Sequence, residues 1–398
     1  MNSPAVHILT GEYPPQPGGV SDYCEQVATG LAEQGVPVHV WSPGTPSGEA
    51  PDGPPGVHVH RVAGLFSLRG LGRLARALDR EPTPRVLLLQ YAPNALGSRG
   101  MNMAACLWLL IRSRRDEVRV MFHEPYFYFG VRHLHRNVLA VVQRLMAVVL
   151  LGASRLVYLS SGTWERYLSH YMWLGGRQLM WLPIPATVPR CDDDVAVRRC
   201  RAELSGGDSA VRVIGHFGTY GAHVRPLLES CFTELAGLDS RLRFACLGRN
   251  SSAFVASLDA RVPGLRGRVV ASGGVESRQV AARLRACDVV VQPFADGVTT
   301  RRTSLMASLV NGCPTVTTVG SLTEPIWVEE DGVAVARVGD AAGLASRVLE
   351  LLADDARRLA LGRAGADLYD RRFALRHVVR QLTTASAGPR PPGAPPLP

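Results

Sequence analysis

The feature that most constrains the fold is a regular alternation of short apolar runs and helical patterns in the second half of the 398-residue chain. Apolar or Thr-rich runs predict strands at 211–216, 243–247, 269–271, 289–292 and 315–318. Helical patterns occupy 226–236, 277–286, 304–311, 342–352 and 356–369. Strands that alternate with helices favour a parallel sheet covered by helices on both faces. This half is therefore predicted to be a doubly wound, Rossmann-like α/β domain.

The first half begins with the same kind of unit. A strand at 6–9 is followed by a Pro- and Gly-rich loop at 11–19, a helix at 21–34 and a strand at 38–41. Further buried strands are predicted at 86–90, 118–122 and 156–159. Strand, glycine loop, helix and strand form one half-unit of a doubly wound sheet. We therefore predict a second Rossmann-like domain here.

The alternation breaks between 183 and 209, where prolines, three consecutive aspartates and the stretch SGGDS occur. We predict an N-terminal domain at 1–190, a linker at 191–210, a C-terminal domain at 211–370, a closing helix at 371–386 and a disordered Pro-rich tail at 387–398. The length of the chain suits two domains. Two such domains are expected to face each other across a cleft, with ligands outside the carboxyl ends of the strands.

The charge balance is basic, with a formal net charge of +10 that comes from arginine. Such an excess favours an anionic partner, although a solvated basic surface explains it equally well. The arginines lie in separate helices and loops rather than in one stripe with aromatic residues, which argues against a nucleic-acid partner. Eight cysteines without a C-x-x-C pair argue against zinc, iron–sulfur and dithiol chemistry.

The N-terminal sequence has no basic region followed by an apolar stretch, so we expect no signal peptide and a cytoplasmic protein. The most apolar stretch, 137–153, is interrupted by Gln143 and Arg144. A buried helix explains this stretch better than a membrane span, which needs about 20 apolar residues.

The sharpest candidate for a binding site is the segment 296–304, Asp-Gly-Val-Thr-Thr-Arg-Arg-Thr-Ser, which follows a predicted strand and precedes a helix. Hydroxyls and exposed backbone N–H groups at a helix start form an anion site. Arg301 and Arg302 add two guanidinium groups that match phosphate oxygens. We predict that this segment binds a phosphate-bearing ligand; the alternative is a capped helix with surface arginines.

Four weaker candidates also follow predicted strands. They are the adjacent glycines Gly18 and Gly19, the turn 217–221 with Arg225 behind it, His123, and Glu324. Adjacent glycines let a ligand approach the backbone closely, and a carboxylate such as Glu324 can accept hydrogen bonds from ribose hydroxyls. A plain turn, a structural histidine and a surface carboxylate are the corresponding alternatives.

The order of these pieces resembles the retaining glycosyltransferases of the GT-B fold, in particular the large family 4, over roughly 6–382. The likeness rests on the loop 12–19, His123 at a strand end, Ser160 and Ser161, the turn 217–225, the strand CDVVVQPF at 287–294 and the segment NGCPTVTT at 311–318. Gly312 and Pro314 are its most recognisable residues. The resemblance implies a nucleotide-diphosphate sugar on the C-terminal domain and an acceptor on the N-terminal domain.

The resemblance also implies roles for individual residues. His123 is expected near the donor sugar as a catalytic residue, together with Asp296. The expected donor-binding residues are Gly18, Gly19, Gly218, Thr219, Arg225, Thr299, Thr300, Arg301, Arg302, Thr303, Ser304 and Glu324. The family usually carries two glutamates at positions that correspond to Thr299 and Ala307. We expect Asp296 to take the place of the first and Glu324 the place of the second.

The implied reaction is sugar transfer with retention of the anomeric configuration, without a metal or other cofactor. The acceptor would be a glycan, a lipid-linked saccharide or a small molecule. Two alternatives stay open at this point. One is a catalytically silent GT-B protein that binds a nucleotide sugar and partners a true transferase; the other is an epimerase or hydrolase that acts on the nucleotide sugar itself.

A basic region beside apolar helices suggests a peripheral contact with the inner face of the membrane. Its residues are Arg112, Arg114, Arg115, Arg119, Arg132, His133, His135 and Arg136. Such a region would suit a lipid-linked acceptor at an anionic leaflet. Ordinary solvated helix faces are the alternative.

Overall fold

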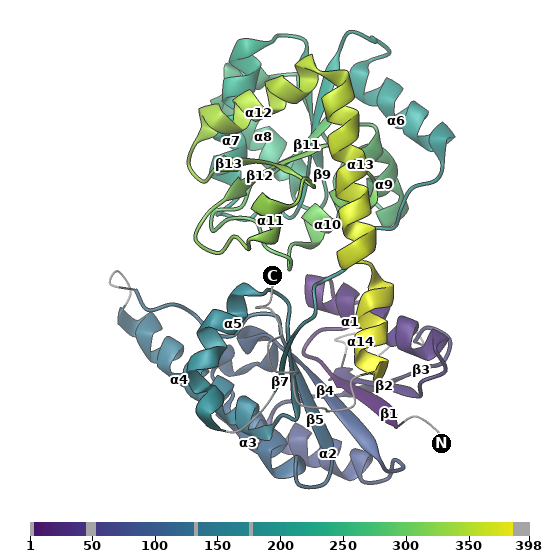
Figure 1. Cartoon of the computed structure of the whole chain (residues 1–398), viewed down its shortest axis with the longest axis vertical. Helices are drawn as coiled ribbons and strands as arrows, with labels where there is room; N and C mark the ends of the chain where they lie inside the picture. The colour runs from purple at the N-terminus through teal and green to yellow at the C-terminus, as the bar shows by residue number, and fades with distance from the viewer. Residues whose placement is uncertain (1–3, 45–52, 131–133, 175–177, 385–398) are drawn as a thin grey trace. The chain divides into compact units, whose positions relative to one another are not determined.

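The computed structural model describes residues 4–44, 53–130, 134–174 and 178–384, and the chain divides into two compact units (Figure 1). Unit 1 consists of Met1–Pro183 and Leu375–Pro398, and unit 2 of Ile184–Ala374. Each unit contains one parallel sheet with helices around it. The predicted fold class, two Rossmann-like α/β domains, is therefore confirmed. The predicted tail at 387–398 lies outside the described residues.

The sheet of unit 1 has the strand order β3-β2-β1-β4-β5-β6-β7, and all neighbouring strands are parallel. The strands are β1 (Ala5–Leu9), β2 (Val38–Pro43), β3 (Val57–Val62), β4 (Arg85–Tyr91), β5 (Glu117–Phe122), β6 (Leu156–Leu159) and β7 (Gln178–Trp181). Every residue of β4 is buried, because this central strand is covered on both faces. The winding of the sheet reverses between β1 and β4.

The helices of unit 1 come from both ends of the chain. They are α1 (Gly19–Glu33), α2 (Leu68–Leu78), α3 (Met103–Arg112), α4 (Leu134–Ala153), α5 (Thr163–Leu168) and α14 (Leu375–Thr384), with short 3-10 turns η1 (Pro93–Leu96), η2 (Ser98–Gly100) and η3 (Ser169–Leu174). The predicted closing helix is α14, which packs against α1. Arg119 on β5 fixes it by donating a hydrogen bond to the Leu382 carbonyl at 3.0 Å.

One helix in the described part of the chain, α4, contains a stretch that is long and apolar enough to cross a membrane. The stretch is Arg136–Ala153, and 39% of it is buried. A core helix of a globular unit meets the same test, so this stretch alone does not indicate a membrane span.

Buried ion pairs around Asp116 connect the amino-terminal ends of β4 and β5 with the end of α3. The Asp116 carboxylate accepts from Arg85 at 2.9 Å and from Arg112 at 2.5–2.7 Å, and Arg112 also reaches Asp79 at 2.6 Å. The prediction of a basic membrane surface is therefore wrong for Arg112, which is 5% exposed, and for the buried Arg119, which pairs with Glu117 at 2.7 Å. The side chains of 132, 133 and 135 lie outside the described residues.

The sheet of unit 2 has the order β10-β9-β8-β11-β12-β13, again fully parallel. The strands are β8 (Arg212–Phe217), β9 (Leu242–Leu247), β10 (Val269–Ala271), β11 (Val289–Gln292), β12 (Thr315–Val319) and β13 (Ala334–Arg337). The helices are α6 (Asp194–Ser205), α7 (Arg225–Leu238), α8 (Ser251–Arg261), α9 (Ser277–Arg285), α10 (Thr303–Val310), α11 (Ile326–Glu329), α12 (Ala341–Ala353) and α13 (Asp355–Arg372), with the 3-10 turn η4 (Pro263–Leu265).

Two apolar clusters fill the two faces of this sheet. Side chains of α7, α8 and α12 pack on one face, and side chains of α6, α9 and α10 pack on the other. The sheet is thus buried on both sides, as its continuous apolar strands require.

The prediction of a linker at 191–210 is wrong, because most of this segment forms helix α6. The Asp193 side chain caps this helix by accepting from the Ala196 N–H at 2.9 Å. Arg201 on α6 pairs with Asp288 at 2.6 Å and donates to the Val211 carbonyl at 2.9 Å. These contacts fix α6 to unit 2, so the boundary lies after Pro183 and the second domain is longer than predicted.

We predict that Asp116→Asn lowers the free energy of unfolding by roughly 3–5 kcal/mol, because it leaves two buried guanidinium groups without their shared carboxylate. Urea unfolding followed by circular dichroism measures this change. The exposed Asp331 provides a matched control, and Asp331→Asn should be neutral. Equal stability of the two variants would show that the buried pairs contribute little.

Candidate functional site

The winding of the unit 2 sheet reverses between β8 and β11, which are neighbours in the strand order. The loops that leave the carboxyl ends of these strands diverge, and such a switch point is where open parallel sheets bind ligands. The predicted turn at 217–221 follows β8, and the predicted segment 296–304 follows β11. The structure therefore brings these two predicted segments to the same switch point.

Strand β12 holds the first part of the loop that follows β11. The Thr318 hydroxyl accepts from the Phe294 N–H at 2.7 Å and donates to the Phe294 carbonyl at 2.8 Å. The Val298 N–H donates to the Thr318 carbonyl at 2.8 Å. The loop after β11 thus continues strand-like pairing with β12 beyond the sheet and has a fixed path.

Gly297 lets this loop pack against the loop that follows β12. Its φ is +94°, and a Cβ at this position would collide with the Thr323 hydroxyl and the Gly320 backbone. The Leu322 N–H donates to the Asp296 carbonyl at 2.9 Å. Only glycine satisfies both the positive φ and the close approach.

Glu324 is the anchor of this loop. Its carboxylate accepts from the Thr300 N–H at 2.5 Å, from the Thr300 hydroxyl at 2.7 Å and from the Trp327 indole at 3.2 Å. The side chain is 1% exposed. The expectation that Glu324 contacts a ribose is therefore corrected, because the carboxylate is buried and engaged by groups of its own unit; it fixes the backbone beside the predicted donor residues instead.

Asp296 lies between the two predicted phosphate ligands. Its carboxylate forms an ion pair with Arg301 at 3.5 Å and a short one with Arg302. The Arg302 guanidinium also lies over the Phe294 ring, 4.7 Å from its centre. The two arginines are partly exposed, and Asp296 holds both of them at the carboxyl edge of the sheet.

Helix α10 begins at Thr303, so the N–H groups of Thr303 and Ser304 belong to its first turn and have no acceptor within the helix. Thr299 is fully buried, and its hydroxyl has no hydrogen-bond partner among the described residues. Ala307 is also fully buried. At the two positions where the family usually has glutamates, this chain therefore has the buried Thr299 hydroxyl and the buried Ala307 methyl group.

The turn after β8 contains Gly218, Thr219 and, at the start of α7, Arg225. Burial lowers the pKa of His216, on β8, to about 4, and His216 Nδ1 lies 2.8 Å from the Val291 carbonyl. Neutral His216 therefore carries its proton on Nδ1, and its buried Nε2 has no partner in the described residues. A Cβ on Gly218 would lie 3.0 Å from that nitrogen. The sequence analysis missed His216.

In unit 1 the predicted catalytic residue His123 follows β5 and is 7% exposed. Its Nε2 lies 2.8 Å from the Gln90 side-chain oxygen, and its ring meets Tyr23 edge-on at 5.2 Å. The His123 carbonyl accepts from the Ser160 hydroxyl at 3.1 Å and the Trp164 indole at 3.2 Å. These contacts join the ends of β4, β5 and β6 with α1 around the histidine.

The loop after β1 forms the other side of the unit 1 switch point. A Cβ on Gly11 would collide with the Ala95 carbonyl, so glycine permits this loop to touch the segment that follows β4. Gly18 precedes α1 in an extended conformation, and a Cβ there would meet only the flexible end of Glu12. A Cβ on Gly19 would meet nothing within 4 Å. The backbone at Gly19 is thus accessible, as the sequence predicts.

Three polar residues close apolar strands at these two switch points, and sequence analysis gave them no role. Gln90 is the second-last residue of β4 and contacts His123, His216 is the second-last residue of β8, and Gln292 ends β11. Each is buried and has one side-chain nitrogen or oxygen without a hydrogen-bond partner among the described residues. A polar residue at the last positions of an otherwise apolar strand was the available signal.

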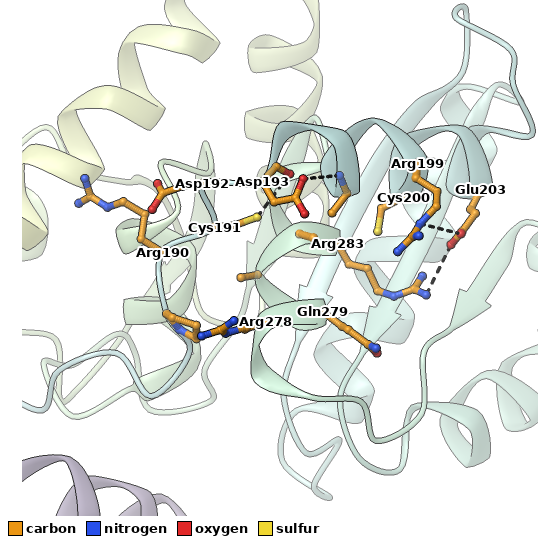
Figure 2. Close-up of a pocket in the computed structure, with 14 residues that line it drawn as sticks. Arg190, Cys191, Asp192, Asp193, Arg199, Cys200, Glu203, Arg278, Gln279 and Arg283 are labelled. Atoms are coloured by element: carbon orange, nitrogen blue, oxygen red, sulfur yellow. Dashed lines mark hydrogen bonds and ion pairs between the residues drawn. The ribbon is translucent and has the colours of Figure 1, made fainter. Parts of the chain in front are cut away.

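A cavity of about 540 Å³ lies elsewhere in unit 2, along α6 and α9 (Figure 2). It contains none of the predicted site residues. Two of its guanidinium groups pair with one of its carboxylates: Glu203 lies 3.5 Å from Arg283 and 4.0 Å from Arg199. This internal pairing makes it a weaker candidate than the switch point.

Comparisons with known proteins give two family matches. Residues 211–354 match the model described as glycosyl transferases group 1, and residues 18–173 match the model described as glycosyl transferase 4-like domain. Curated protein sequences give no match.

Solved structures resemble the chain over nearly its whole length. Sucrose-phosphate synthase from Thermosynechococcus elongatus has a TM-score of 0.72 at 15% identity, with 95% of this chain and 97% of that chain covered. The Anabaena protein HepE in complex with UDP and glucose has a TM-score of 0.67 at 14% identity, with 95% of this chain and 98% of that chain covered. A trehalose-phosphate synthase from Burkholderia xenovorans in complex with glucose-6-phosphate has a TM-score of 0.68 at 10% identity, with 95% of this chain and 99% of that chain covered. At these identities the likeness shows the fold.

We predict that Glu324→Gln destabilises the loop after β11, because an amide places an N–H donor where the carboxylate accepts from Thr300. Loss of a buried charge-assisted bond should lower the free energy of unfolding by about 1.5–3 kcal/mol. Thermal unfolding measures the change. Glu329→Gln, an exposed glutamate on α11, is the matched control and should leave the melting temperature unchanged; equal melting temperatures for both would contradict the anchoring role.

Proposed function

The chain belongs to the glycosyltransferases of the GT-B fold with family 4-like domains, and on this premise we propose that it transfers a sugar from a nucleotide-diphosphate sugar to an acceptor with retention of anomeric configuration. The acceptor is a glycan, a lipid-linked saccharide or a small molecule. Support for a nucleotide-sugar donor comes from the HepE structures, which are complexes with UDP and glucose or with UDP-glucose.

The observation that carries the proposal is the cationic loop at the unit 2 switch point. Arg301 and Arg302 lie beside the first turn of α10, and Asp296 holds both before any ligand binds. A diphosphate at the helix start would compete with one carboxylate for two guanidinium groups, and the first-turn N–H groups would add further donors. These groups support a donor diphosphate at Thr303 and Ser304 in this proposal.

Cleavage of the sugar–phosphate bond leaves negative charge on the departing diphosphate. Guanidinium groups and N–H dipoles that already point there stabilise the transition state more than the ground state. In this proposal the arginines neutralise the leaving group without a metal at the donor site. Asp296 acts as a positioning residue for them, and His123, fixed through Gln90, is the proposed catalytic residue of unit 1.

A screen of nucleotide sugars tests the function. Purified protein is heated with uridine, guanosine, adenosine and thymidine diphosphate sugars, and a stabilising donor identifies the base. That donor is then incubated with acceptor candidates while released nucleoside diphosphate is measured, and the product's anomeric configuration is read by NMR. Stabilisation with acceptor-dependent release and retained configuration supports the proposal. Release or isomerisation without any acceptor supports a hydrolase or epimerase.

A catalytically silent binding protein is the second candidate, and one observation favours it. Ala307 is fully buried where the family usually has a glutamate, and Glu324 is committed to Thr300 instead. Neither position offers a carboxylate to a donor. Stabilisation by a donor without release of nucleoside diphosphate across the acceptor panel would establish this candidate.

We predict that Arg301→Ala and Arg302→Ala each lower kcat/KM for the donor by roughly 10- to 150-fold, which corresponds to about 1.5–3 kcal/mol for a charge-assisted bond to phosphate. Steady-state release of nucleoside diphosphate measures the effect. Arg357→Ala, an exposed arginine on α13, serves as the control. Unchanged kinetics in both loop variants would remove the arginines from the donor site.

We further propose a cytoplasmic protein that contacts an anionic bilayer through α3 and α4. These two helices pack together and expose Leu107, Leu110 and Ile111 from α3 and Val138, Val141 and Leu145 from α4, each at least 36% exposed. Arg114 and Arg115 are exposed directly after α3. Exposed apolar side chains beside cationic groups match a surface of anionic lipid.

Sedimentation with vesicles that contain anionic lipid tests this contact. Wild-type protein should sediment at low salt and less at high salt, and Ile111→Glu should reduce sedimentation by removing an inserted side chain and adding repulsion. Leu359→Glu, at an exposed leucine on α13, should behave like wild type. A wild-type protein that stays in solution at low salt would contradict the contact.

A further inference from the structure

Four histidines form a row on one face of the unit 1 sheet, near its β3 edge. His7 on β1 is in register with His39 on β2, and His39 is in register with His58 on β3. His60 lies two residues beyond His58, so it shares that face. Neighbouring rings stack: the centres of His7 and His39 are 4.6 Å apart, and those of His39 and His60 are 5.2 Å apart. The row runs from the buried β1 to the accessible edge.

His7 cannot act as a ligand in this arrangement. The Trp41 indole donates to His7 Nδ1 at 3.1 Å, so neutral His7 carries its proton on the other ring nitrogen. Burial lowers the pKa of His7 to about 3, which keeps it neutral. The accessible members of the row are the ones that can bind a ligand.

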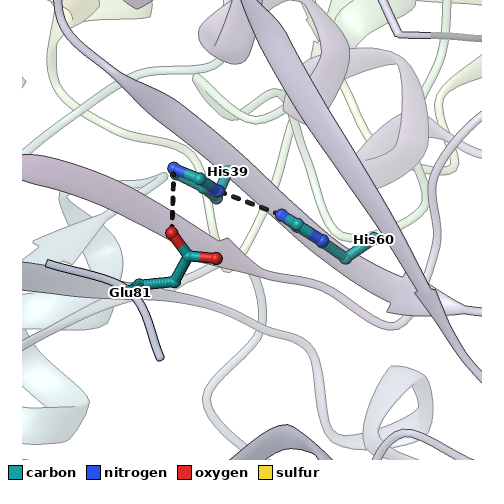
Figure 3. A group of neighbouring side chains, drawn as sticks. All are labelled: His39, His60 and Glu81. Atoms are coloured by element: carbon teal, nitrogen blue, oxygen red, sulfur yellow. Dashed lines mark hydrogen bonds and ion pairs between the residues drawn. The ribbon is translucent and has the colours of Figure 1, made fainter. Parts of the chain in front are cut away.

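His39, His60 and Glu81 converge at the accessible end (Figure 3). His39 Nδ1 lies 3.0 Å from His60 Nε2, and His39 Nε2 lies 3.8 Å from a Glu81 oxygen. One ligand atom from each residue lies within 4.8 Å of the others. All three side chains are partly exposed, so a solute can reach them.

We propose that His39, His60 and Glu81 bind a divalent first-row transition metal, with zinc the best match. Two imidazoles and a carboxylate form a ligand set that zinc accepts, and a fourth tetrahedral position remains for water or for the exposed His58. Zinc–ligand bonds of about 2.0–2.2 Å place tetrahedral ligand atoms roughly 3.3 Å apart. The two ring nitrogens need to separate by only a few tenths of an ångström, and Glu81 is partly exposed and can approach.

The protons balance without a change of net charge on the rings. In the hydrogen-bonded pair one ring donates to the other; when the metal takes both facing nitrogens, each neutral ring carries its single proton on its remote nitrogen.

The position of the cluster assigns it a structural role. His39 is the second residue of β2, and Glu81 lies in the turn between α2 and β4, away from the carboxyl ends where the donor site is proposed. The metal would link β2, the edge strand β3 and the chain after α2. It would stabilise an exposed sheet edge and take no part in sugar transfer, so this inference is independent of the proposed function.

Zinc retention tests the inference on the full chain. Protein is stripped with EDTA, incubated with one equivalent of zinc, desalted and assayed for bound metal, and its melting temperature is compared with magnesium-treated protein. Wild type should retain about one zinc and melt higher with zinc only. Cobalt substitution should give d–d absorption without a thiolate charge-transfer band, which separates this site from the cysteines.

His60→Gln and Glu81→Gln should each weaken zinc binding by more than about 10-fold, the least that loss of even an outer partner costs a metal site. His170→Gln, at an exposed histidine on η3, should retain zinc like wild type. Glu81 lies in a turn, so its variant should melt like stripped wild type in EDTA and remain informative if His60→Gln folds poorly. Zinc that is absent from wild type, or retained equally by Glu81→Gln, would overturn the proposal.

Discussion

All neighbouring strands in both sheets are parallel, and this one constraint decides where chemistry can occur. Every loop that leaves a carboxyl end reaches the same edge, and the loops part only where the winding reverses, between β1 and β4 and between β8 and β11. Helices cover both faces of the unit 2 sheet. Buried polar side chains lie near the carboxyl ends of the strands that flank the two switch points: Gln90 and His216 are second-last in β4 and β8, and Gln292 is last in β11.

Buried carboxylates then fix the segments that cannot be held by apolar packing. A loop that binds a charged ligand has to remain polar, so it gains few apolar contacts. Glu324 compensates with three hydrogen bonds, and Asp288 secures α6 with Arg201 in the same manner. Each carboxylate is paired with several donors, which offsets the cost of burying its charge. The loop after β11 consequently has a fixed path in the structure.

Sequence predicted the parts of the fold that follow from local apolar patterns. The strands at 156–159, 269–271 and 289–292 have the predicted bounds, because each is a short, mainly apolar run that directly follows a charged residue. The edge strand β3 was missed because its VHVHRV pattern alternates with exposed histidines, and α6 was taken for a linker because its few buried side chains lie among charges. The partners of Glu324, as distant as 24 residues along the chain, follow only from tertiary packing.

The position of the loop residues also explains how this chain differs from the pattern it resembles. A carboxylate at position 307 would be buried in the apolar cluster that surrounds α10, where Ala307 packs without exposed surface. A charge there would require a polar partner, and Glu324 already supplies the buried carboxylate that orders the neighbouring loop. The net charge of the partly exposed loop residues is instead +1, because two guanidinium groups, Arg301 and Arg302, face the single carboxylate of Asp296. Under the proposed function, donor binding would therefore depend on attraction between these arginines and the diphosphate more than on carboxylate contacts to the sugar and ribose.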